Sequence, residues 1–95
     1  MSGELPTKSA LLKSFKDDGA MWDYDAVAKI QNAYGIDNDY WKYTLRFYLM
    51  ELAGGGLLEV VEEALDNGTH FKEDSVVFKY KLTDFGMMRV ETLLE

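Results

Sequence analysis

The sequence of residues 54–61 is GGGLLEVV, which marks the end of a predicted helix and the start of a strand. Leu45, Leu49 and Leu52 precede it at the spacing of one helix face. Three successive glycines disfavour further helix, because glycine loses more backbone freedom on folding than any other residue. Residues 80–86, YKLTDFG, then lead from another strand into a last helix. The second half of the chain is therefore predicted to run helix, strand, strand, helix.

Four helices, a short strand and a hairpin are expected over the whole chain from hydrophobic periodicity and capping residues. The predicted helices are residues 8–17, 24–34, 39–53 and a segment after Thr83, and the predicted strands are residues 20–22, 57–63 and 76–82. Thr7, Asp23 and Thr83 are the expected N-terminal caps, and Gly35 is the expected stop of the second helix. The expected core positions of the first three helices are Leu11, Leu12, Phe15, Val27, Ile30, Tyr34, Trp41, Leu45, Tyr48, Leu49 and Leu52.

This order of elements resembles the small winged helix-turn-helix regulators of bacteria and archaea, the MarR-like and PadR-like families. In those families Leu-x-x-Leu and then Gly-Leu-Leu or Gly-Leu-Ile end the recognition helix, as residues 49–58 do here. A Tyr-x-Leu-Thr-x-x-Gly segment closes the wing, as residues 80–86 do. The resemblance covers about residues 7–95 and implies an α+β winged helix: a three-helix core, a two- or three-stranded β-hairpin wing and a C-terminal helix. It also implies dimerisation through terminal helices.

Length and composition limit the classes of function that remain. A chain of 95 residues has room for one modest core, so residues 1–95 are expected to form a single domain. The absence of cysteine excludes disulfides, thiolate metal sites and cysteine nucleophiles. His70, the one histidine, is expected to be a solvated loop residue without a ligand partner. We therefore expect a protein that is not an enzyme, with no catalytic residue, metal or cofactor.

The sequence also bears on location. It shows no basic stretch followed by an apolar run at its start and no apolar window of membrane-spanning length. A cytoplasmic protein without membrane contact is the expectation.

The net charge of −7 weighs against nucleic-acid binding, which depends on neutralising phosphates with Lys and Arg. The acidic residues are concentrated in the predicted wing, whereas in the families that the chain resembles the wings that contact DNA use Arg or Lys. Residues 57–75 contain one cation, Lys72, against Glu59, Glu62, Glu63, Asp66, Glu73 and Asp74. We favour cross-strand pairing of Glu59 or Glu63 with Lys79 and Lys81 over an acidic docking role.

The family resemblance assigns DNA contacts to the start and outer face of the third helix. In this chain the corresponding residues are Asn38, Lys42, Tyr43, Thr44, Arg46 and Phe47. Arg46 can read guanine and Asn38 can read adenine, because their side chains match the donors and acceptors of the major groove. A dimer would then place two copies of this helix in successive major grooves of double-stranded DNA, with Lys8, Lys13 and Lys16 in support.

The same helix face is unusually apolar, which leaves a second hypothesis open. Tyr43, Phe47 and Met50 point away from the core, and they are either covered by helix one and a terminal segment or exposed as an interface. Met88 and Thr92 lie on a flank of the last helix that can face a second subunit. The resemblance places a DNA-binding transcriptional regulator first. The alternative is an acidic winged-helix protein–protein interaction module that does not bind DNA, with a homodimer or another protein as partner.

Overall fold

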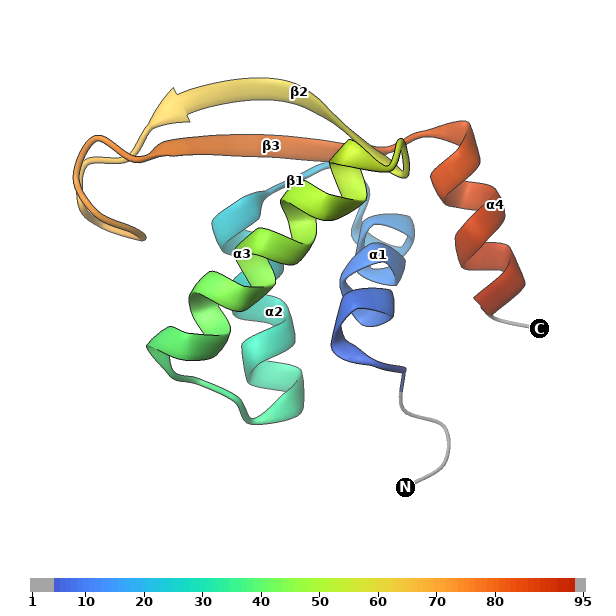
Figure 1. Cartoon of the computed structure of the whole chain (residues 1–95), viewed down its shortest axis with the longest axis horizontal. Helices are drawn as coiled ribbons and strands as arrows, with labels where there is room; N and C mark the ends of the chain where they lie inside the picture. The colour runs from blue at the N-terminus through green and yellow to red at the C-terminus, as the bar shows by residue number, and fades with distance from the viewer. Residues whose placement is uncertain (1–4, 94–95) are drawn as a thin grey trace.

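A computed structural model of the chain describes residues 5–93, which form four helices and a three-stranded antiparallel sheet (Figure 1). The elements in chain order are α1 (Thr7–Asp18), β1 (Met21–Trp22), α2 (Asp23–Tyr34), α3 (Asp39–Gly54), β2 (Leu58–Leu65), β3 (Val76–Leu82) and α4 (Asp84–Leu93). The predicted α+β class and the predicted order of elements are confirmed. The first hairpin strand begins one residue later than expected and continues to Leu65.

The sheet has the order β1-β3-β2, so β3 lies in the middle. β1 pairs with β3 through two residues, whereas β2 pairs along β3 from Leu58 opposite Leu82 to Leu65 opposite Val76. Val61 is bulged out of this register. Strands β2 and β3 therefore continue past the short β1 as a two-stranded arm, whose connecting loop turns back toward the helices (Figure 1).

The core lies between the sheet and the first three helices, with α4 at the far end from the tip of the arm (Figure 1). The predicted inward stripes are confirmed, because their aliphatic and phenylalanine members are buried and their tyrosine and tryptophan members pack partly buried against them. Side chains of the middle strand alternate as expected, with Phe78, Tyr80 and Leu82 in or against the core. The expected alternation fails at the start of β3: Val76, expected on the inner face, is 40% exposed, whereas Val77, expected on the outer face, is 3% exposed.

Two of the three expected N-terminal caps are wrong. α1 begins at Thr7 itself after Pro6, and no side chain caps it. α2 begins at Asp23, whose carboxylate is turned inward to β3 and does not cap the helix. Thr83 is confirmed as a cap, since its hydroxyl oxygen accepts a hydrogen bond from the Gly86 N–H at 2.9 Å.

Helix ends around the α2–α3 turn follow local rules. Gly35 ends α2 in the left-handed region, at φ 65° and ψ 36°, as predicted. Asn38 caps α3, because its Oδ1 accepts a hydrogen bond from the Trp41 N–H at 2.9 Å. The turn therefore presents α3 at a fixed angle to α2.

The start of α4 is held against the start of β2. The Thr83 hydroxyl donates to the Gly56 carbonyl at 2.6 Å, and the Thr83 N–H donates to the Leu57 carbonyl at 3.2 Å. Gly86 is buried one turn later, where a Cβ atom would lie 2.0 Å from the Leu57 carbonyl oxygen. Only glycine permits this approach, which gives the final residue of the YKLTDFG stretch a packing role. Among residues 5–93, no helix has the length and apolarity to cross a membrane.

Candidate interaction surface

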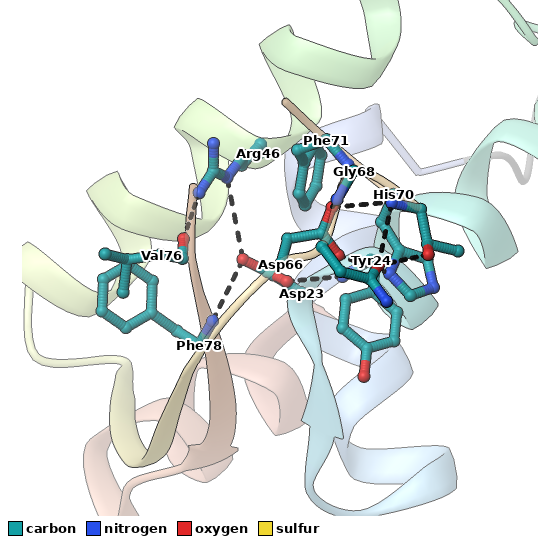
Figure 2. A network of polar contacts seen from close by, with 11 residues as sticks. Asp23, Tyr24, Arg46, Asp66, Gly68, His70, Phe71, Val76 and Phe78 are labelled. Carbon is teal, nitrogen blue, oxygen red and sulfur yellow. Dashed lines mark hydrogen bonds and ion pairs between the residues drawn. The ribbon is translucent and has the colours of Figure 1, made fainter. Parts of the chain in front are cut away.

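The loop between β2 and β3, residues 66–75, folds back onto the first half of α3 (Figure 2). Its Phe71 side chain is buried. The guanidinium carbon of Arg46 lies 4.3 Å from the centre of the Phe71 ring, and Lys42 Nζ lies 5.2 Å from it. The Tyr43 ring centre is 6.0 Å from that of Phe71. The loop thus brings together three of the residues predicted to contact DNA and covers part of their surface.

Asp66 fixes the conformation of this loop. Its Oδ2 accepts hydrogen bonds from the N–H groups of Gly68, His70 and Phe71 at 3.1, 3.0 and 2.9 Å (Figure 2). The Phe71 N–H bond contributes most to lowering the pKa of Asp66 to about 2, and the bonds from His70 and Gly68 act in the same direction against desolvation. Asp66 is therefore an internal loop cap rather than part of the exposed acid of the arm.

His70 also belongs to this arrangement. Its Nδ1 is 2.9 Å from Asp66 Oδ1, and its ring stacks on Tyr24 with centres 3.7 Å apart. Tyr24 in turn is nearly parallel to Trp22, at 5.8 Å. The prediction of a loop histidine is confirmed and its side chain is 39% exposed, but the ring is also stacked and hydrogen-bonded, which the sequence did not predict. Asp66-Asn67-Gly68 is recognisable in the sequence as a turn, but nothing local shows that this turn docks on α2.

Arg46 makes an ion pair inside the molecule. Its Nε lies 3.7 Å from Asp23 Oδ2, and its terminal nitrogen donates to the Val76 carbonyl (Figure 2). Asp23 is 1% exposed, whereas the side chain of Arg46 is 15% exposed. The Asp23 carboxylate also accepts from the N–H of Tyr24 at 2.7 Å and of Phe78 at 3.2 Å. The predicted guanine-reading side chain thus links α2, α3 and β3.

Burial raises the pKa of Asp23, and the Phe78 N–H, the Tyr24 N–H and the Arg46 charge oppose that rise. Desolvation is the larger influence, so the pair depends on Arg46 and the two N–H groups to keep the carboxylate charged. Nε of Arg46 is itself buried and has no hydrogen-bond acceptor among the described residues. Removing either partner would leave a buried polar group without compensation.

The remaining residues predicted to bind DNA are placed in different ways. Asn38 caps α3, Thr44 is partly buried and Phe47 is exposed. Of the supporting lysines, Lys8 Nζ lies 3.1 Å from Glu51 and Lys13 Nζ lies 2.8 Å from Asp17. Lys16 is exposed, and neither Lys16 nor Lys42 forms an ion pair with another described residue, so only Arg46, Lys8 and Lys13 of the expected cations are paired within the chain.

An apolar stripe is exposed on α3, which answers the question that the sequence left open. We call it the α3 stripe; its members and exposed fractions are Tyr40 72%, Tyr43 42%, Phe47 56% and Met50 42%. Tyr40 was missing from the predicted interface, although its spacing of three and seven residues from Tyr43 and Phe47 places it on the same face. Contiguous apolar side chains exposed on a protein surface commonly mark a site that binds another molecule.

The arm is acidic on its surface. Glu59 Oε1 lies 3.5 Å from Lys81 Nζ across the strands, which confirms cross-strand pairing for Glu59. Both side chains are about half exposed, so this pair contributes at most about 1 kcal/mol. Glu63 instead stands opposite Phe78. Glu62, Glu63, Glu73 and Asp74 are exposed and form no ion pair with another described residue.

α4 has one buried and one exposed flank, as its sequence predicts. Gly86 and Val90 are buried, whereas Met88 is 64% exposed. Thr92 is exposed on the flank of Met88 and donates from its hydroxyl to the Met88 carbonyl at 3.1 Å. The sequence also places Leu94, four residues after Val90, on the inner flank, but Leu94 lies outside the described residues.

No model of a known protein family matches this chain, and no curated protein is significantly similar to it in sequence. Within residues 5–93, no three His, Asp or Glu side chains come together as a metal ion would require. Function must therefore be argued from the surfaces described above.

Acid should loosen the loop through Asp66. Its pKa is about 2 in the folded chain and 3.8 as the reference value, so the stabilisation is complete above about pH 4 and is lost as pH falls toward 2. The slope of the unfolding free energy against pH reports the difference in bound protons between the unfolded and folded chain. In Asp66→Asn this difference should be smaller by up to one proton between about pH 4 and pH 2, as measured by urea unfolding. Asp23 acts in the opposite direction, because its pKa is raised, and it is unchanged in the variant. Equal acid dependence in wild type and Asp66→Asn would contradict the assigned role of Asp66.

Proposed function

We propose that this chain is a winged-helix protein–protein interaction module that binds its partner through the α3 stripe and does not bind DNA. One observation carries the proposal: Phe71 packs on Lys42, Tyr43 and Arg46, three of the α3 residues that would contact DNA, and Arg46 is paired with buried Asp23. The stripe left exposed on this helix is aromatic and apolar. Such side chains supply desolvation area and anchor protein interfaces.

The winged-helix part of the proposal is supported by the order of the elements. Three helices with a short β1 after the first precede a β2–β3 hairpin, and a closing helix follows. The leucines of residues 49–58 and the glycine of residues 80–86 lie at helix–strand and strand–helix junctions, as the resemblance implies.

Magnitudes favour a protein partner over DNA. If Arg46 turned outward to contact a base, buried Asp23 would lose its counter-charge. Breaking a buried ion pair in this way typically costs about 3–5 kcal/mol. A good bidentate base contact returns only about 1–3 kcal/mol of discrimination. The exposed acid on the arm would add repulsion from the phosphate backbone. Both effects act in the same direction.

A second candidate is the DNA-binding regulator that the family resemblance implies. The observation in its favour is the exposed Met88 flank of α4, which offers a surface for a homodimer with two copies of α3 on one duplex. DNA binding would then require the loop to leave α3 and release Lys42 and Arg46. The two candidates make opposite predictions for the free protein.

A fluorescence titration of random-sequence duplex DNA at low salt separates the candidates. The interaction module is expected to show no binding at micromolar protein, because Arg46 is paired with buried Asp23 and the net charge of the chain is −7. The regulator predicts binding that weakens steeply as salt rises. Salt-sensitive binding that Lys42→Ala or Arg46→Ala weakens would overturn the proposal.

The α3 stripe is tested by one substitution and a matched control. Phe47→Asp should reduce retention of a partner by tagged protein at least tenfold, because loss of an interface anchor typically costs about 2 kcal/mol. Met88→Asp makes the same chemical change at a similarly exposed site on α4 and should retain the partner. Quantitative mass spectrometry of proteins retained from source-cell extract gives the comparison. Equal loss in both variants, or in neither, counts against the stripe.

A further inference from the structure

Strand β2 has one edge bonded to β3 and a second edge that no other described strand occupies (Figure 1). The strand is eight residues long, and every residue after Leu58 is exposed. An exposed strand of this length presents a row of backbone N–H and C=O groups to which another extended chain can pair. The edge is therefore a candidate docking site for a strand.

The side chains of β2 differ on the two faces of the sheet. Val60 stands opposite the core residue Tyr80, and Leu65 stands opposite the exposed Val76, which is on the same face of β3 by alternation. Val60 and Leu65 are 43% and 66% exposed. Glu59 and Glu62 stand opposite Lys81 and Lys79 on the other face. One face of the β2 edge is thus mainly apolar, with Glu63 as its exception, and the other face carries Glu59 and Glu62.

The helix that carries the α3 stripe lies next to the strand with the free edge. α3 is the helix that packs against β2, while α2 packs against β1 and β3. Arg46, in the middle of α3, also bonds to the carbonyl of Val76, the residue that pairs with Leu65. α3 thus ends beside the start of β2 (Figure 1), and its middle reaches the arm at Val76.

We propose that the free edge of β2 binds an extended segment of a partner protein as a fourth strand, with alternating apolar and Lys or Arg side chains. This deepens the proposed function, because it rests on the chain being an interaction module and names how its partner binds. Apolar side chains of the segment pack beside Val60 and Leu65, and its cations face Glu59 and Glu62.

Charge selects this occupant over a second copy of the chain. β2 carries three glutamates in eight residues, and the whole chain has a net charge of −7. Pairing β2 with the β2 of another copy brings two acidic strands together, and like charges in neighbouring strands are destabilising. A cationic segment meets no such repulsion.

The probe for the test is a capped peptide of alternating lysine and valine, titrated into the full chain at physiological salt. Binding is expected, with slowed hydrogen exchange of the β2 amides that face the free edge. Methylating alternate backbone nitrogens of the peptide should weaken binding at least tenfold, because it removes the pairing N–H groups and leaves the charge unchanged. Absence of binding, or equal affinity of the methylated peptide, overturns strand addition.

Charge variants separate pairing at the edge from general attraction. The double variant Glu59→Lys with Glu62→Lys should weaken binding at least tenfold. The control Glu73→Lys with Glu91→Lys changes the net charge equally at exposed positions outside β2 and should weaken it less than threefold. Equal loss in both would overturn the proposal. The α3 stripe is judged separately, by partner retention in Phe47→Asp, so failure of strand addition and failure of the proposed function give different results.

Discussion

Gly86→Ala should lower the free energy of unfolding by about 3 kcal/mol or more. The new Cβ would lie 2.0 Å from the Leu57 carbonyl oxygen and 2.9 Å from Leu82 Cδ2. The oxygen belongs to the backbone, so no rotamer change relieves the clash, and α4 must separate from the start of β2. Urea unfolding followed by circular dichroism measures the loss.

Gly54→Ala is the matched control for this substitution. Gly54 is the last residue of α3, and a Cβ there meets no atom within 4 Å. Its unfolding free energy should stay within about 1 kcal/mol of wild type, on either side, since alanine also favours the helix. A Gly86→Ala midpoint equal to that of Gly54→Ala would show that α4 does not depend on this close approach.

Asp23→Ala should cost about 3–5 kcal/mol, the second large effect. The substitution removes the counter-charge of Arg46 and the acceptor of the Phe78 N–H, both in the interior. Asp25→Ala is the control, because Asp25 is exposed in the same first turn of α2 and should cost less than about 1 kcal/mol. Chemical unfolding of both variants gives the comparison.

A double-mutant cycle tests whether the cost of Asp23→Ala arises from the pair. Asp23→Ala with Arg46→Met should cost less than the sum of the single changes by about 1 kcal/mol or more, because the second change removes the charge left without a partner. Additive costs would mean that Asp23 and Arg46 stabilise the fold independently, and the argument against DNA reading by Arg46 would then weaken.

Periodicity predicted most of the fold because it reports on contacts that repeat along one element. The leucines of α3 and the alternation of Phe78, Tyr80 and Leu82 identify surfaces that face one common core. The YKLTDFG stretch predicted a strand followed by a capped helix, and the Thr83 cap is formed. These features depend on residues that are close in the sequence, so they can be predicted from the sequence.

The covered state of α3 could not be predicted in the same way. A helical wheel shows that Arg46 points away from the leucines, but it does not show that Phe71 lies over it. The pair of Asp23 and Arg46 joins residues from separate helices and depends on the path of β3. Asp23 was predicted to cap α2 because local rules assign aspartate at a helix start to that role, whereas tertiary packing turned it inward.

The rings of Trp22, Tyr24 and His70 are nearly parallel, so tryptophan fluorescence can report whether the loop is docked. Emission from an indole responds to the aromatic groups beside it, and the outermost ring of this stack belongs to the loop. Separating the loop from α2 would remove His70 from the stack and change the fluorescence of Trp22. The protein therefore carries an internal reporter that needs no attached dye, and a Trp41→Phe background would isolate its signal.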